Sequence, residues 1–137
     1  MKKDIILGYD LNEKYCQISF YDETKEEPET LETETDNYQI PLMLGYYKEK
    51  WVYGKEAKRL AALQEGITVT DIFEKAVRQE KVKVGSRKRD GVWLLAKFIK
   101  LTLEEYDEIS YLTLSVPYTN IDLSKMRKGI GNYLGIP

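Results

Sequence analysis

Histidine is absent from the sequence and cysteine occurs once, as Cys16. A zinc site built from histidine and cysteine ligands and a serine-histidine catalytic triad are therefore excluded. A single cysteine also cannot form an internal disulfide, which agrees with a reducing compartment. Without a histidine to activate its thiol, Cys16 is expected to be a buried small apolar residue rather than a nucleophile. Any chemistry must come from carboxylates, lysines, hydroxyls or a metal with oxygen ligands.

The sequence also lacks long apolar runs. No segment approaches the roughly 18 apolar residues that a membrane-spanning helix needs, and the apolar stretch near the N-terminus is too short for a signal peptide. The 137 residues are 42% hydrophobic and 32% charged, with a formal net charge of -2. These values are typical of one soluble globular domain, so we expect a cytoplasmic protein with no membrane partner.

The N-terminal part of the chain has the patterns of three consecutive strands. Asp4–Asp10 resembles a strand buried on both faces, and Tyr15–Asp22 alternates with period two, as a strand with one buried face does. Only Leu11–Lys14 separates them, which favours a hairpin. The acidic segment Pro28–Asp36 is predicted to be an edge strand whose carboxylates discourage pairing with other chains.

Short strands and a helix are predicted in the middle of the chain. Pro41–Gly54 has the pattern of two strands around a polar turn at Lys48–Lys50. Good helix formers follow it. They carry a narrow apolar stripe, formed by Ala57, Leu60, Ala61 and Leu63.

A second short helix and a basic hairpin are predicted next. Thr70 or Asp71 is expected to cap the helix. Its buried face is predicted to contain Ile72, Phe73, Ala76 and Val77. Residues 81–93 have the form of a hairpin with a basic turn at 87–89. Because one basic loop is not a surface stripe and the pI of about 5.4 is acidic, we predict no nucleic-acid partner.

The C-terminal third has the pattern of a helix, a strand and a helix. Gly91–Tyr106 is predicted to be an amphipathic helix that covers a sheet face, and Ile109–Pro117 a strand that stops at proline. Asn120 or Asp122 is expected to cap the last helix. The apolar stripes are Val92, Leu95, Ala96, Ile99 and Leu103 in the first helix and Leu123, Met126, Ile130 and Leu134 in the second.

These elements predict an α/β fold with a mixed sheet, in which an antiparallel strand meander is followed by helix, strand and helix. We expect residues 1–137 to form a single domain. Residues 37–90 interrupt the order between the meander and the helix. They are predicted to form a smaller inserted subdomain.

Three segments of the chain carry a family resemblance through their order. GYDLNEKYCQIS is a strand that ends in aspartate, then a turn and a strand. VYGKEAKRLAALQEGITVTDIFEKAV contains a small-residue helix and a loop that leads to a phenylalanine-acid-lysine region, and LTLSVPYTNIDLSKMRKGIGNYLGI is a strand ending in valine-proline before a helix. In this order they resemble the N-terminal part of the ATPase domain of actin, sugar kinases and, most of all, the seventy-kilodalton heat-shock chaperones. The resemblance implies a ribonuclease-H-like fold.

The resemblance also implies roles for individual residues. In this family the aspartate that matches Asp10 lies near the metal of Mg-ATP, usually through water, so Asp10 is implied as a metal-side and catalytic carboxylate. The turn after it donates N–H and hydroxyl groups to the phosphates. The implied nucleotide-binding residues are Asp10, Leu11, Asn12, Glu13 and Lys14. Lys75 falls near the family's catalytic lysine.

The loop departs from the family pattern at three positions. Asn12, Glu13 and Lys14 stand where the family has a glycine and two threonines. Asn12 can adopt a positive φ, though less readily than glycine. Glu13 would repel a triphosphate unless it faces away or binds the metal, whereas Lys14 could offset that charge.

The family's second phosphate motif, adenosine motif and opposite lobe lie beyond the point matched by Pro137. We therefore expect a fragment of a longer ATPase lobe, with ATP and Mg²⁺ bound in the longer parent protein and little catalysis by the fragment alone. Expected partners are a nucleotide, the remainder of the ATPase domain and, through uncovered apolar surface, further copies of the fragment. Two alternatives remain: a degenerate, non-hydrolysing actin-like interaction or scaffold module, and an unrelated α+β binding domain in which Asp10 and Asn12 only form a turn.

Overall fold

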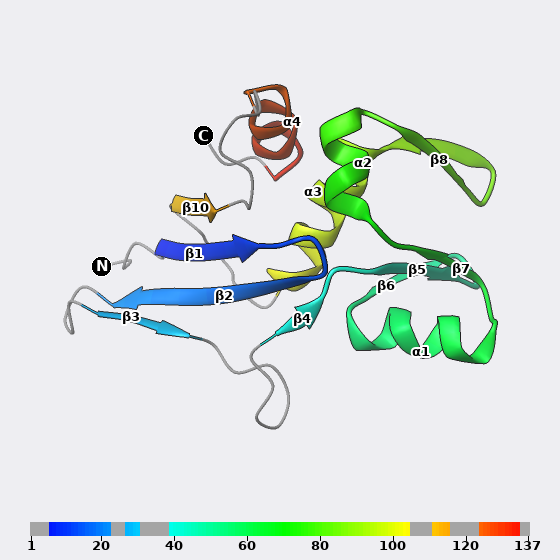
Figure 1. Cartoon of the computed structure of the whole chain (residues 1–137), viewed down its shortest axis with the longest axis horizontal. Helices are drawn as coiled ribbons and strands as arrows, with labels where there is room; N and C mark the ends of the chain where they lie inside the picture. The colour runs from blue at the N-terminus through cyan, green and yellow to red at the C-terminus, as the bar shows by residue number, and fades with distance from the viewer. Residues whose placement is uncertain (1–5, 23–26, 31–38, 105–110, 116–123, 135–137) are drawn as a thin grey trace.

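The structure is a computed structural model, and it describes residues 6–22, 27–30, 39–104, 111–115 and 124–134. In this part of the chain the fold is mixed α/β, with four helices and three small sheets. The largest sheet lies at the left of Figure 1 and a smaller sheet with its own helix lies at the right. The other helices lie between the two sheets and toward the top of the view.

The main sheet contains the predicted hairpin and meander. Its strands are β1 (Ile6–Leu11), β2 (Tyr15–Asp22), β3 (Glu27–Thr30), β4 (Ile40–Pro41) and β10 (Tyr111–Ser115). β1, β2 and β3 are antiparallel neighbours, and β10 pairs with β1 in parallel, so the strand order is β10-β1-β2-β3. β3 is an edge strand, as predicted. The rest of the predicted edge strand, residues 31–36, lies outside the described residues.

A second sheet follows the short strand β4, which pairs with β2. It has the order β6-β5-β7 and consists of β5 (Leu44–Tyr47), β6 (Lys50–Tyr53) and β7 (Ile67–Val69). β5 and β6 are the predicted pair, joined by Lys48 and Glu49, which both have positive φ as a two-residue hairpin turn requires. The pattern did not predict β7, which has only three residues and no alternation of its own.

Helix α1 (Lys55–Leu63) contacts this second sheet. Ala57 is its one buried residue, whereas Leu63 is 54% exposed. The predicted stripe was therefore wrong at its C-terminal end. A helix that packs on only three short strands can bury only the turn that lies directly over them.

Helix α2 (Ile72–Arg78) buries Ile72, Phe73 and Ala76, which confirms the predicted face. The predicted cap was wrong. Asp71 occupies the N-cap position with a left-handed φ of 54°, and its side chain makes no cap hydrogen bond. A cap needs an extended backbone to direct the side chain at the first amides, which a left-handed residue does not provide.

The hairpin after α2 consists of β8 (Lys81–Val84) and β9 (Arg87–Asp90). Its turn is formed by Gly85, with a φ of 65°, and Ser86. The predicted basic turn was therefore wrong, because residues 87–89 belong to β9. All the elements from β5 to β9 lie within residues 37–90, and the independence of this insertion as a subdomain stays a prediction.

Helix α3 (Gly91–Thr102) begins directly after β9, and the Asp90 carboxylate caps it by accepting a hydrogen bond of 2.8 Å from the Trp93 N–H. The helix ends earlier than the predicted Tyr106, since Leu103 has left the helical conformation. Its buried residues include Leu95, Ala96 and Ile99 of the predicted stripe, and also Leu94 and Phe98. Val92 of the stripe is only half-buried, and Leu103 is buried just beyond the end of the helix. A helix buried on two sides lies between other elements, and α3 contacts α2, α4, β6 and β9.

Helix α4 (Ser124–Leu134) packs against α3 and buries Met126 and Ile130, two residues of the predicted stripe. The predicted caps Asn120 and Asp122, and Leu123, lie outside the described residues. A Cβ on Gly129 would lie 2.6 Å from Val92 Cγ1. Glycine therefore allows the close approach of the two helices, and this contact offsets its low helix propensity.

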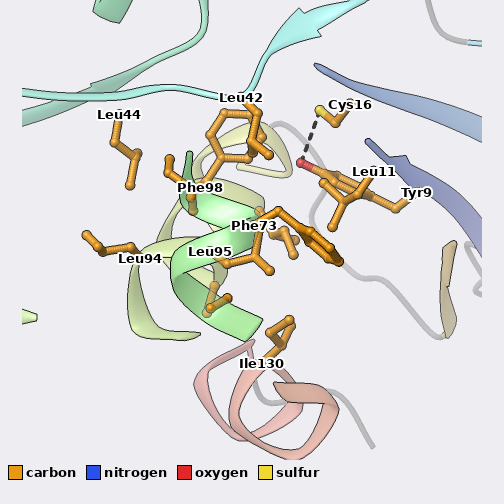
Figure 2. Close-up of a cluster of buried hydrophobic side chains, with 14 of the residues drawn as sticks. Tyr9, Leu11, Cys16, Leu42, Leu44, Phe73, Leu94, Leu95, Phe98 and Ile130 are labelled. Atoms are coloured by element: carbon orange, nitrogen blue, oxygen red, sulfur yellow. Dashed lines mark hydrogen bonds between the residues drawn. The ribbon is translucent and has the colours of Figure 1, made fainter. Parts of the chain in front are cut away.

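One core connects the main sheet to the helices. In Figure 2, Tyr9 and Leu11 from β1 point toward Phe73 of α2 and toward Leu94, Leu95 and Phe98 of α3. The buried cluster also includes Cys16, Ile18, Leu42, Leu44 and Ile130. Among the described residues, no helix is both long and apolar enough to cross a membrane.

Candidate functional site

The loop selected from the sequence, residues 12–14, joins β1 to β2 at one end of the strands of the main sheet. Tyr9 and Leu11 face the core, so the alternation of the strand leaves Asp10 exposed between them. β1 and β10 are parallel, with Asp10 opposite Ser115, so the carboxyl ends of both strands lie side by side at this end of the sheet. In open sheets with parallel strands, ligands usually bind beyond the carboxyl ends of those strands. Asp10 is therefore an exposed carboxylate at the carboxyl end of β1, and its assignment to a nucleotide site stays a prediction.

Asn12 organises the loop with its side chain. Its Oδ1 accepts hydrogen bonds from the N–H groups of Lys14, at 2.8 Å, and Tyr15, at 2.7 Å. Its own N–H donates to the Tyr15 carbonyl at 2.9 Å. This is an Asx-type turn, which needs no positive φ, and Asn12 does not have one. The interpretation of Asn12 as a substitute for a left-handed glycine was therefore wrong.

This hydrogen bonding limits what the loop can bind. The Lys14 and Tyr15 amides, which a phosphate would need, already donate to Asn12 within the loop. The Lys14 carbonyl also accepts a hydrogen bond of 2.8 Å from the Leu42 N–H, which ties the loop to the chain beyond β4. Binding of a phosphate by these amides would require the Asn12 side chain to rotate away. The loop as it stands does not fit a triphosphate.

The Asp10 carboxylate, in contrast, fits a metal-side role. It forms no hydrogen bond or ion pair with any other residue in the described part of the chain, so its lone pairs face solvent. Magnesium keeps several waters and takes one or two carboxylates together with phosphate oxygens, so one exposed carboxylate is sufficient on the protein side. Within the described residues there is no cluster of three or more acidic or cysteine side chains that could hold a metal without such a ligand.

Lys75 lies on α2, and among the described residues its ammonium group forms no ion pair with the Asp10 carboxylate. Its Nζ donates a hydrogen bond of 2.7 Å to the Thr70 carbonyl, just before the start of its own helix. This bond gives the ammonium group a structural role at the exposed N-terminus of α2. The proposed catalytic use of Lys75 stays a prediction that requires the side chain to leave Thr70.

The one cysteine is part of a buried hydrogen-bond chain beneath the loop. The Cys16 thiol donates to the Tyr9 hydroxyl at 3.4 Å, as the dashed line in Figure 2 shows. The Tyr9 hydroxyl donates to Thr102 Oγ1 at 2.8 Å, which in turn donates to the Ile99 carbonyl at 2.7 Å. Burial raises the pKa of the thiol from 9.0 to about 12. Cys16 is thus no nucleophile at neutral pH, as its sequence context predicted.

The Asx turn makes a testable contribution to stability. Replacing Asn12 with alanine removes the Oδ1 atom that accepts both hydrogen bonds, and we expect the free energy of unfolding to fall by about 1 kcal/mol. Asn12→Asp keeps an oxygen acceptor and should lose less than half as much. Urea-induced unfolding measures both changes. Equal losses in the two variants would show that the side-chain hydrogen bonds do not hold the loop.

Sequence reasoning gave Asn12 only a general turn role, in one of its alternatives, and did not predict the two hydrogen bonds of its side chain. It also missed a pocket whose lining comes from residues 79–93 and 129–133. The aromatic residues of this pocket gave no signal because they are far apart in the sequence.

Comparison with known proteins identifies one family. The model of the "Family of unknown function (DUF5716) C-terminal" matches residues 27–137. No curated protein matches the chain.

Proposed function

The chain belongs to the DUF5716 C-terminal family, and we propose that it is the first part of an actin-like, heat-shock-chaperone-like nucleotide-binding domain. The observation that carries this proposal is the strand order β10-β1-β2-β3. Three antiparallel strands extended by a parallel fourth, which follows helix α3, form the arrangement that the resemblance implies. The family match covers this whole arrangement except β1 and β2.

The exposed Asp10 supports a nucleotide role at this position. In the complete protein, Asp10 would be the carboxylate that holds the Mg²⁺ of Mg-ATP, and Lys14 would add a positive charge beside the phosphates once the Asn12 side chain has rotated away from the loop amides. The metal, when bound, neutralises phosphate charge. The other nucleotide-binding motifs of the resembled family have no match in this chain, so the chain alone should bind nucleotide weakly.

Isothermal titration calorimetry with Mg-ATP on the complete protein tests the proposal. We expect Asp10→Asn to weaken binding about tenfold or more, which is a loss of roughly 1.4 kcal/mol. Asp71→Asn is a matched control, because Asp71 is also an exposed aspartate and asparagine tolerates its left-handed φ of 54°. Affinity should be unchanged in the control. Absence of heat from the unmodified protein would contradict the nucleotide role.

The occupied loop amides favour a second candidate function. A degenerate actin-like module that does not hydrolyse ATP would keep the fold as a scaffold, and Asn12 would lock its former phosphate loop. In that case the unmodified protein gives no heat with Mg-ATP. The triple variant Asn12→Gly, Glu13→Thr, Lys14→Thr would then restore measurable binding, because it frees the amides and removes the repelling carboxylate.

A further inference from the structure

A pocket of about 400 Å³ lies where the β8–β9 hairpin meets helices α3 and α4. Sites for small molecules have volumes of about 300–1,000 Å³, so the pocket is large enough for one. Its lining includes Lys81, Asp90, Trp93, Gly129 and Tyr133. No lining residue belongs to β1 or to the loop at residues 12–14. The pocket is therefore a different place from the candidate nucleotide site.

Two aromatic side chains give the pocket a fixed apolar wall. The rings of Trp93 and Tyr133 lie edge to face, with centroids 5.8 Å apart and an angle of 81° between their planes. Trp93 also packs on Trp51, at 5.5 Å, which in turn packs on Tyr46 at 5.1 Å. Because these contacts connect the wall to the second sheet, the wall is already formed without a ligand.

Positive charge surrounds this aromatic wall. Lys81 lines the pocket and is exposed. The Arg89 guanidinium lies 4.1 Å from the centroid of the Trp93 ring, and Lys100 Nζ lies 5.4 Å from that of Tyr133. The one carboxylate in the lining, Asp90, accepts the Trp93 N–H as the helix cap. In the described part of the chain no carboxylate pairs with Lys81, so its ammonium group can receive an anion.

From this combination we propose that the pocket binds a small molecule in which a planar apolar ring carries an anionic group. The ring packs against Trp93 and Tyr133, and the anion lies at Lys81. The cations held over the two rings disfavour a cationic ligand. A neutral planar molecule gains the packing but not the charge-assisted contact, so it binds more weakly.

Anilinonaphthalene sulfonate is the probe, because it joins planar rings to an anion and its fluorescence rises on binding. Phenylnaphthylamine, which has the same rings without the charge, is the neutral counterpart. We expect Lys81→Gln in the full natural chain to lower the affinity for the sulfonate probe about tenfold and the affinity for the neutral probe less than twofold. Tyr133→Leu should lower the affinity for both probes, because the rings of both probes pack against the aromatic wall.

Lys83→Gln is the matched control. Lys83 is also exposed and lies two residues along β8 on the same side of the strand, but it does not line the pocket. Its replacement should change either affinity less than twofold. Circular dichroism confirms that each variant is folded. The proposal would be overturned if Lys81→Gln and Lys83→Gln lowered the affinity for the sulfonate probe equally, or if neither lowered it. It would also be overturned if Lys81→Gln abolished binding of the neutral probe.

Discussion

Replacing Phe98 with alanine is expected to lower the free energy of unfolding by about 3–5 kcal/mol. Phe98 is 0% exposed and belongs to the buried cluster in Figure 2. Its ring contacts Tyr53 of β6 edge to face, with centroids 6.0 Å apart, so it connects α3 to the second sheet. Alanine would leave a cavity where two structural units meet. Urea-induced unfolding followed by circular dichroism measures the loss.

Two further substitutions define what the Phe98 result means. Phe98→Leu keeps most of the volume and should cost less than about 1.5 kcal/mol. Leu63→Ala, at a side chain that is 54% exposed, should stay within about 0.5 kcal/mol of the unmodified protein. A loss for Phe98→Ala as small as that of Leu63→Ala would contradict the packing of β6 on α3.

Phe98 also shows where sequence patterns stop being informative. The helical stripe of α3 was predicted correctly at Leu95, Ala96 and Ile99, because one buried face imposes a period of 3.6 residues. Phe98 and Leu94 are off that stripe. They are buried because the insertion between β4 and α3 folds back onto the other side of the helix. No local periodicity encodes a contact between residues that are more than forty positions apart, such as Tyr53 and Phe98.

The strands of the main sheet were easier to predict than the basic hairpin. Tyr15–Asp22 was predicted with its observed bounds, since strict alternation at Cys16 and Ile18 is a signal that few other structures give. In the hairpin, three consecutive basic residues suggested a solvent-exposed turn. The backbone instead turns at Gly85, where a φ of 65° favours glycine, and the charges lie along an exposed strand.

For the candidate site, the sequence predicted the hairpin around Asp10 but not the hydrogen bonds that form within its loop. Asp10 is exposed because it lies between two residues that the core requires, and this follows from alternation. The capture of the Lys14 and Tyr15 amides by Asn12 depends on the exact geometry of a short loop. The comparison of Asn12 with a glycine considered only the backbone conformation. It overlooked that the asparagine side chain can accept the hydrogen bonds of the loop N–H groups in place of a phosphate.

The buried chain of Tyr9 and Cys16 predicts that the protein loses stability at alkaline pH. Burial raises the pKa of Cys16 from 9.0 to about 12. The pKa of Tyr9 rises well above 10.0, first because of burial and then because of the neighbouring Cys16. Both groups are neutral when protonated. The folded state therefore holds their protons to higher pH than the unfolded state does.

The sign of the effect follows from the number of bound protons. Below about pH 9 both states are protonated and the stabilisation is fully present; above it the unfolded state binds fewer protons, so the free energy of unfolding decreases with pH. The slope for one group approaches about 1.4 kcal/mol per pH unit once the pH is well above the unfolded pKa, which amounts to roughly 2 kcal/mol for Cys16 between about pH 9 and pH 11. Tyr9 adds to this loss above about pH 10.

Comparison of the unmodified protein with Cys16→Ala measures the contribution of the thiol together with the part of the raised Tyr9 pKa that the thiol causes. Exposed lysines and tyrosines titrate equally in both proteins, so their contributions cancel in the difference between the two stability curves. Cys16→Ala is expected to be less stable near neutral pH, because it loses buried volume, and to lose roughly 2 kcal/mol less between about pH 9 and pH 11. Urea-induced unfolding at a series of pH values gives both curves. Parallel curves would mean that the thiol ionises equally readily in the folded and unfolded states, and that water reaches Cys16 beneath the loop.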